Sequence, residues 1–138
     1  MSNKRTFARS IEALEEIFSF LSDFFSREEL GEGPAFAFNF VVEELFTNMV
    51  KYNTGSGGIS IEIQRSGDRI LLDLVDHDVD PFDIANAPEK DTSLPIGERE
   101  PGGLGLQLVK SMVDKIAYEY RNRTMTISVA KYLEQENV

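Results

Sequence analysis

Three glycines lead into an apolar segment near residue 105, an arrangement that can bring bare backbone close to an anion. They stand in the run Gly102-Gly103-Leu104-Gly105, ahead of Leu106, Leu108 and Val109. Glycine has no Cβ and reaches positive φ, so phosphate oxygens can approach its main chain. The N-terminus of a helix adds unpaired N–H donors and a partial positive charge. The run therefore predicts a phosphate site, although glycines are also typical of ordinary loops.

A carboxylate and an amide lie four residues apart on a predicted helix that spans about 35–52. At 100° per residue, Glu44, Asn48 and Lys51 fall on one side of its apolar stripe, whereas Glu43 projects from the opposite shoulder. Carboxylate and amide oxygens are the ligands that magnesium takes. An ordinary solvated i,i+4 pair is the alternative interpretation. The stripe itself, expected to be core, consists of Phe38, Val41, Val42, Leu45, Phe46 and Met49.

An acidic cluster follows the strand predicted over 70–75, in the run Asp76-His77-Asp78-Val79-Asp80-Pro81-Phe82-Asp83. A carboxylate at a strand's exit can accept a hydrogen bond from the exocyclic amine of a purine. A calcium loop is a second interpretation, but its glycine at position six and glutamate at position twelve are replaced by Pro81 and Ala87. A solvated turn is the third. His77 is expected to be an exposed loop residue rather than a general base.

The order of elements predicts the fold class. Helices are expected over 10–25, with Ser10 as N-cap, over 35–52 and over 103–114; strands are expected over 59–63, 70–75, 116–120 and 124–130. Gly31-Glu32-Gly33-Pro34 should separate the first two helices. The segment 76–102 holds four of the five prolines and predicts a long functional loop. This order indicates an α+β two-layer sandwich, with helices on one face of a largely antiparallel sheet.

Composition narrows the function classes. The chain has 138 residues, 41% of them hydrophobic, which fits one domain with a substantial core. It has no cysteine and a single histidine, which excludes disulfides and multi-histidine zinc sites. A net charge of −10 argues against binding to nucleic acid or to anionic membranes. Without a long apolar run, the chain is expected to be cytoplasmic.

Taken together, the motifs resemble the Bergerat ATP-binding fold of DNA gyrase and histidine kinases, and most closely its compact branch, the anti-sigma-factor serine kinases. The segment 43–52 looks like the N box of that branch, 81–83 like the end of its first glycine box, and 102–109 like its second glycine box. The resemblance covers nearly the whole chain. It implies one histidine kinase-like ATPase domain over 1–138, with a mostly antiparallel mixed sheet and an ATP lid at about 83–102.

The resemblance also implies roles for the matching residues. Glu44 would be the general base for a protein serine hydroxyl, Asn48 would coordinate the Mg²⁺ that bridges the ATP phosphates, and Asp76 would bind the adenine amine. The family pattern has glycine where Asp78 stands, and an alignment from Pro81 shifts the expected aspartate onto His77, so Asp78 is the second candidate for adenine. The other cofactor-binding residues expected are Lys51, Gly102, Gly103, Leu104, Gly105 and, through water, Thr124 or Thr126.

The function implied is that of an ATP-binding anti-sigma regulatory factor. It would be a serine/threonine protein kinase that phosphorylates a small anti-anti-sigma protein, with a sigma factor as a second expected partner, and that forms a homodimer. A non-catalytic module of the same fold that sequesters its partner is the main alternative. The catalytic half of a histidine kinase fits less well, because the chain shows no dimerisation helix with a phosphoacceptor histidine.

Overall fold

The chain folds around a five-stranded antiparallel sheet. The computed structural model describes residues 3–53, 55, 57–79 and 102–133. Within them the strand order is β1-β2-β3-β5-β4, and each neighbouring pair is antiparallel. The strands are β1 (Lys4–Phe7), β2 (Ile59–Ser66), β3 (Arg69–His77), β4 (Lys115–Arg121) and β5 (Thr124–Tyr132). The parallel pairing of a mixed sheet is therefore not found in the described strands.

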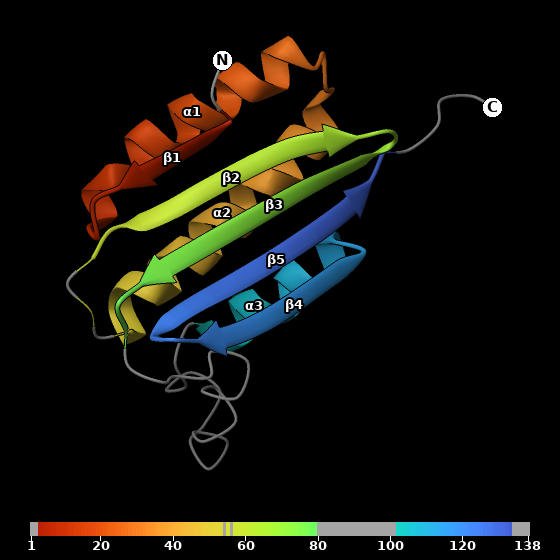
Figure 1. Ribbon diagram of the computed structural model, residues 1–138. Coiled ribbons are helices and arrows are strands. Elements are labelled where there is room, and N and C mark those ends of the chain that lie inside the picture. Colours follow the sequence, from red (N-terminus) through yellow and green to blue (C-terminus); the bar gives the residue numbers. More distant parts are fainter. Residues whose placement is uncertain (1–2, 54, 56, 80–101, 134–138) are drawn as a thin grey trace.

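The helices cover one face of this sheet and leave the other face open (Figure 1). A short 3₁₀ turn, η1 (Ile11–Ala13), leads into α1 (Leu14–Arg27); α2 (Glu32–Tyr52) lies behind the central strands, and α3 (Gly102–Met112) lies behind β4 and β5. The predicted α+β two-layer sandwich is confirmed. None of the helices in the described residues is long and apolar enough to cross a membrane.

The core lies between the two layers and follows from the periodicities of the sequence. Every second residue of β3 faces the helices, and the same alternation holds in β5. The predicted stripe of α2 is fully buried against these strands, at 0% exposure for all six residues. The sheet contributes Ile59, Ile61, Ile63, Ile70, Leu72, Leu74, Ile127 and Val129, and α1 contributes Ile17, Leu21 and Phe24.

Several boundaries differ from the predicted ones. The helix α2 begins at Glu32 rather than near 35, because Pro34 lies in the first turn, where no backbone N–H is needed for a helical bond. Ser10 does act as an N-cap, accepting a hydrogen bond from the Glu12 amide at 3.2 Å, but it caps η1 rather than an α-helix. The strand β1 is an addition to the prediction; it pairs with β2 at the edge of the sheet.

Candidate functional site

The predicted carboxylate–amide pair lies on α2, at the side that faces α3. Asn48 donates from Nδ2 to Oε2 of Glu44 at 3.3 Å, and Asn48 is only 2% exposed. A solvated surface pair is therefore the wrong description. Since an ionised carboxylate only accepts hydrogen bonds, the amide nitrogen faces Glu44 and the amide oxygen is the atom suited to a cation. Glu43 and Lys51 are both exposed.

The first turn of α3 packs directly against Glu44. A Cβ added to Gly105 would lie 2.1 Å from the Glu44 carboxylate, so only a glycine leaves room for that group. Gly105 lies inside a right-handed helix, and its function here is small size rather than the positive φ expected from sequence. Gly102, Gly103 and Leu104 form the start of the same helix. The N-terminal end of α3 is thereby held against the one carboxylate predicted to act as a base.

The environment of Glu44 raises the pKa of its carboxyl group above its ordinary value of 4.5. Burial is the largest cause, because it removes water from the charged form, and the nearby charge of Glu43 adds to it. The hydrogen bond from Asn48 and the charge of Lys51 act in the opposite direction. A carboxylate with a raised pKa is a stronger base when ionised.

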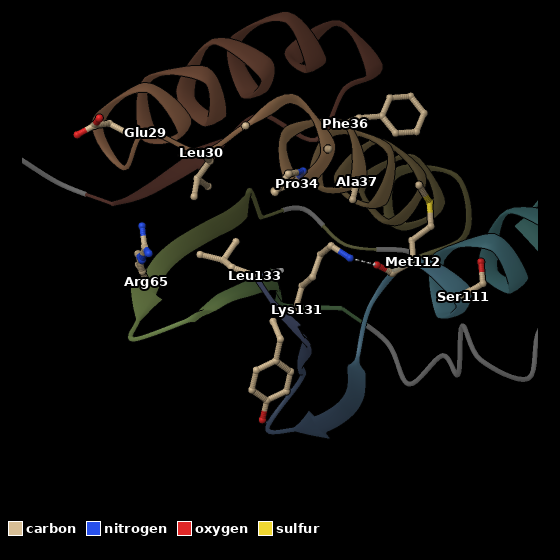
Figure 2. Close-up of a pocket in the computed structure, with 13 residues that line it drawn as sticks. Glu29, Leu30, Pro34, Phe36, Ala37, Arg65, Ser111, Met112, Lys131 and Leu133 are labelled. Atoms are coloured by element: carbon tan, nitrogen blue, oxygen red, sulfur yellow. Dashed lines mark hydrogen bonds between the residues drawn. The ribbon is translucent and has the colours of Figure 1, made fainter. Parts of the chain in front are cut away.

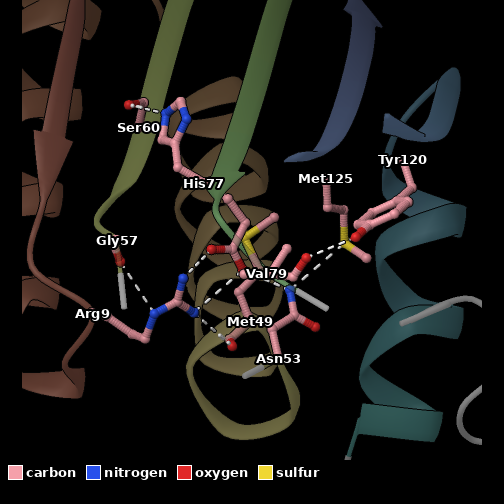
Figure 3. Close-up of polar contacts among 10 residues, drawn as sticks. Arg9, Met49, Asn53, Gly57, Ser60, His77, Val79, Tyr120 and Met125 are labelled. Atoms are coloured by element: carbon pink, nitrogen blue, oxygen red, sulfur yellow. Dashed lines mark hydrogen bonds and ion pairs between the residues drawn. The ribbon is translucent and has the colours of Figure 1, made fainter. Parts of the chain in front are cut away.

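Asp76, the residue predicted to bind adenine, is fully buried and held by an arginine from the N-terminal segment. Both Nη atoms of Arg9 contact its carboxylate, Nη2 at Oδ1 and Nη1 at Oδ2. Arg9 is fixed in turn by the backbone carbonyls of Gly57, at 3.2 Å, and Met49, at 3.4 Å (Figure 3). Arg9 lies 67 residues from Asp76 in the chain, and no sequence motif pointed to the pair.

Asn53 completes the cluster around Asp76. It follows the last residue of α2, is 5% exposed and donates from Nδ2 to Oδ2 of Asp76 at 2.6 Å. The same nitrogen lies 3.7 Å from the sulfur of Met125 on β5. The amide oxygen points away from Met125 (Figure 3) and, among the described residues, has no hydrogen-bond partner. Asn53 is not among the residues predicted from sequence; its position directly after the N box was the available signal.

Asp78 adopts the backbone conformation that glycine favours. Its φ is 54°, in the left-handed region where side chains other than those of Asn and Asp are rare. The family pattern has glycine at this position when Asp76 is taken as the adenine-binding aspartate, and the conformation favours that alignment over the one that starts from Pro81. The Asp78 carboxylate itself accepts a hydrogen bond from Nε of Arg123 at 2.8 Å, on the surface.

The strand register separates Thr124 from this cluster. Thr124 pairs with His77 and Thr126 pairs with Val75, whereas Met125 pairs with Asp76. Because side chains alternate between the two faces, both threonines lie on the face opposite Asp76, and Met125 is the β5 residue on the site's face. The register therefore gives no support to the predicted adenine contact of Thr124 or Thr126.

His77 lies at the end of β3 rather than in a loop, and it is exposed as expected. Its Nε2 lies 3.1 Å from Oγ of Ser60, on the open face of the sheet. The predicted ATP lid lies almost wholly outside the described residues, as do Asp80 and 81–83. In the parts of the chain that are described, no group of three or more His, Asp or Glu could hold a metal ion.

A cavity of about 650 Å³ is lined by residues at the end of the sheet opposite Asp76, among them Arg65 and Lys131, and Figure 2 shows these lining residues. It is bordered by the α1–α2 connection, the end of α3 and the end of β5. Arg65 and Lys131 are the cations among its lining residues, and Nζ of Lys131 donates to the backbone carbonyl of Met112 at 2.9 Å. Glu44, Asn48 and Asp76 do not line it, so the two ends of the molecule are chemically distinct.

The chain is similar to known proteins over most of its length. The sequence model of the histidine kinase-like ATPase domain matches residues 7–131. Serine-protein kinase RsbW of Staphylococcus aureus, in strains MSSA476 and JH9, is 33% identical over 105 residues. Those residues make up 70% of this chain and 65% of the relative, so this chain spans slightly less than two thirds of the curated relatives.

Two solved structures share the fold. The RsbU and RsbW domains of Rv1364c from Mycobacterium tuberculosis match with a TM-score of 0.69 at 13% identity, over 94% of this chain and 32% of that one. The Acinetobacter baumannii histidine kinase AdeS matches with a TM-score of 0.54 at 17% identity, over 98% of this chain and 70% of that one. These likenesses concern the fold alone. With the family's sequence model matching residues 7–131, the protein belongs to the histidine kinase-like ATPase domain family.

Proposed function

We propose that this protein is an ATP-dependent serine/threonine protein kinase of the anti-sigma type, which phosphorylates a small anti-anti-sigma protein. The similarity to serine-protein kinase RsbW supports the reaction class. The observation that carries the proposal is the contact between Gly105 and Glu44. This contact puts the N-terminus of α3 beside a half-buried carboxylate whose pKa is raised. A sigma factor as second partner and a homodimer belong to the same proposal.

The residues present fit a magnesium-bound nucleotide. At the phosphate end, α3 offers the unpaired N–H groups of its first turn, and Gly105 leaves space that a Cβ would fill. At the other end, the buried amide oxygen of Asn53 lacks a partner among the described residues. Asn48 would supply one amide oxygen to Mg²⁺; because no group of three or more acidic or histidine side chains among the described residues could hold a metal ion, phosphate oxygens would supply further ligands.

Each residue then has a distinct task. When bound, ATP would supply the phosphoryl group and Mg²⁺ would neutralise charge that develops during its transfer. Glu44 would accept the proton of the partner's serine hydroxyl while that oxygen forms a bond to the γ-phosphorus and the bond from the γ-phosphorus to the β,γ-bridging oxygen breaks, which releases ADP. Lys51 and the N–H groups of α3 stabilise the negative charge, and the cluster around Asp76 holds the adenine end. The chain contributes mainly positioning and electrostatic stabilisation, as phosphoryl transfer requires.

The test compares two adjacent carboxylates. Glu44→Ala is expected to lower phosphotransfer to a co-encoded anti-anti-sigma protein by roughly 100-fold or more, the usual contribution of a general base. Mg-ATP affinity should stay close to that of the wild type, since Glu44 acts on the partner's hydroxyl. Glu43→Ala is the matched control, because Glu43 is exposed on the opposite shoulder of α2 and its charge is the smallest influence on the pKa of Glu44; it should lower phosphotransfer far less than Glu44→Ala and leave Mg-ATP affinity close to that of the wild type. Phosphotransfer retained by Glu44→Ala would refute the assignment of the base.

The residues around Asp76, where adenine would bind, favour a second candidate function, that of a module that sequesters a partner. Asp76 is engaged by Arg9 and Asn53, and Asp78 adds a negative charge where the family has glycine. Both features weaken the case for tight ATP binding and suit a module that sequesters a partner without catalysis. Such a module would bind the anti-anti-sigma protein or the sigma factor without labelling either from [γ-³²P]ATP.

A further inference from the structure

The adenine end carries a buried acceptor that the proposed function leaves unassigned. The amide oxygen of Asn53 is inaccessible to solvent and has no partner in the part of the chain that the structure describes. A buried polar atom without a hydrogen bond is rare and costly, so a ligand or a bound water is expected to satisfy it. A nucleotide as that ligand depends on the proposed function, the binding of ATP.

The orientation of this amide is fixed by its neighbours. The nitrogen of Asn53 lies 2.6 Å from a carboxylate oxygen of Asp76, and only a donor is acceptable there. The oxygen must therefore be the atom that points away from Asp76, whichever way an amide could otherwise be flipped. The side chain of Asn53 is locked in one direction, and its free group is an acceptor.

Asp76 is a less suitable hydrogen-bond acceptor for a purine amine than Asn53. Its two oxygens already accept three hydrogen bonds, two from the Nη atoms of Arg9 and one from Asn53. The guanidinium also neutralises the charge of the carboxylate. Arg9, Asp76 and Asn53 form a chain of hydrogen bonds. Within this chain, the side-chain atom without a hydrogen-bond partner among the described residues is the amide oxygen of Asn53.

We infer that the amide oxygen of Asn53, rather than the carboxylate of Asp76, accepts the exocyclic amine of the adenine. Asn53 directly follows the helix that carries Glu44 and Asn48, and it lies roughly 13 Å from Glu44 along the axis at 1.5 Å per residue. The phosphate end and the base end thus lie in sequence along α2. Arg9 and Asp76 act as positioning residues, because they hold the amide in the orientation that presents its oxygen.

This arrangement selects for purines that donate at C6. Guanine and hypoxanthine carry a carbonyl at that position, and two acceptors facing each other would leave the buried oxygen of Asn53 unpaired. Asn53 therefore controls which base the protein accepts and has no control over the phosphates.

The experiment is a binding cycle that crosses the protein group with the nucleotide group. Equilibrium affinities of the full chain are measured with Mg²⁺ for ATP and for purine riboside 5′-triphosphate, which lacks only the exocyclic amine. Wild type is expected to prefer ATP by about three- to tenfold, the contribution of one neutral hydrogen bond. In Asn53→Ser, whose hydroxyl can still donate to Asp76, the preference should fall to about onefold.

Asn53→Ala provides a second variant with the same expected loss of preference, should the serine variant fail to fold. Thr124→Ala is the matched control, since Thr124 lies on the opposite face of the sheet, and its preference should equal that of wild type. A preference that survives in both Asn53 variants assigns the amine to Asp76 and overturns the inference. Equal affinities in wild type also overturn it, because a water then satisfies the oxygen. Absence of binding by either nucleotide refutes the proposed function itself.

Discussion

Glu44 is subject to opposing influences that together set its chemistry. Burial removes water from the carboxylate and raises its pKa, whereas the Asn48 amide and the charge of Lys51 stabilise the ionised form. A carboxylate that is costly to ionise in the folded chain lowers the stability of the fold. The unfavourable free energy of the partly buried charge disappears when Glu44 takes up a proton. The same environment that destabilises the protein therefore makes Glu44 a better base.

This conflict predicts the effect of Glu44→Gln on stability. The folded chain binds the Glu44 proton more tightly than the unfolded chain, so the penalty is absent well below pH 4.5 and is complete above the raised pKa. The variant should therefore melt at a higher temperature than wild type at pH 7, and the difference should vanish as the pH falls below about 4. Thermal melts from pH 3.5 to 8 measure this. Equal melting temperatures at all pH values would contradict the raised pKa.

At the residue scale, sequence reasoning could find neighbours on one helix but not distant partners. Glu44 and Asn48 were predictable, because i and i+4 positions share a helix face whatever surrounds the helix. The ion pair of Arg9 with Asp76 joins residues 67 positions apart, and it depends on β1 lying beside β2. The face of the sheet on which Thr124 lies was not predictable either. Alternation shows that every second side chain of a strand shares a face, but it does not show which of the two sets faces the helices.

At the scale of elements, the site is the seam between α2 and α3. The stripe of α2 fixes that helix on the sheet, and Gly105 allows α3 to approach the Glu44 carboxylate. The long elements were predictable from periodicity because each has a continuous buried face. The strand β1 was not, because only Phe7 among its four residues is buried and no alternation is visible.

The close packing of α3 on Glu44 leads us to expect that Gly105→Ala lowers phosphotransfer while it leaves stability nearly unchanged. The new Cβ would collide with the Glu44 carboxylate, which is the end of a flexible side chain and can move aside. Stability should change little, by about 1 kcal/mol or less, because alanine also favours the helix relative to glycine. Phosphotransfer should fall by roughly tenfold or more as the base leaves its position. Urea unfolding and labelling by [γ-³²P]ATP measure the two quantities. A large loss of stability with unchanged phosphotransfer would contradict this role of the glycine.

At the scale of the whole molecule, the site must work against the charge of the chain. The net charge of −10 repels a nucleotide, so binding depends on local groups: the N-terminus of α3, Lys51 and a magnesium ion. Lys51 is on α2 and the glycines are at the start of α3, and both helices lie on one face of a sheet whose opposite face is open (Figure 1). The layer arrangement and this charge were both predictable from sequence, whereas the structure added that Arg9 neutralises the buried carboxylate of Asp76 on that face.

The most direct test of the central claim is equilibrium dialysis of the full chain against labelled ATP, with Mg²⁺ and with EDTA. We expect saturable binding of about one ATP per chain, and weaker binding in EDTA, because Asn48 would act on the phosphates through the metal. No retained ATP at millimolar concentration with Mg²⁺ would contradict the account and leave the partner-sequestering module as the function.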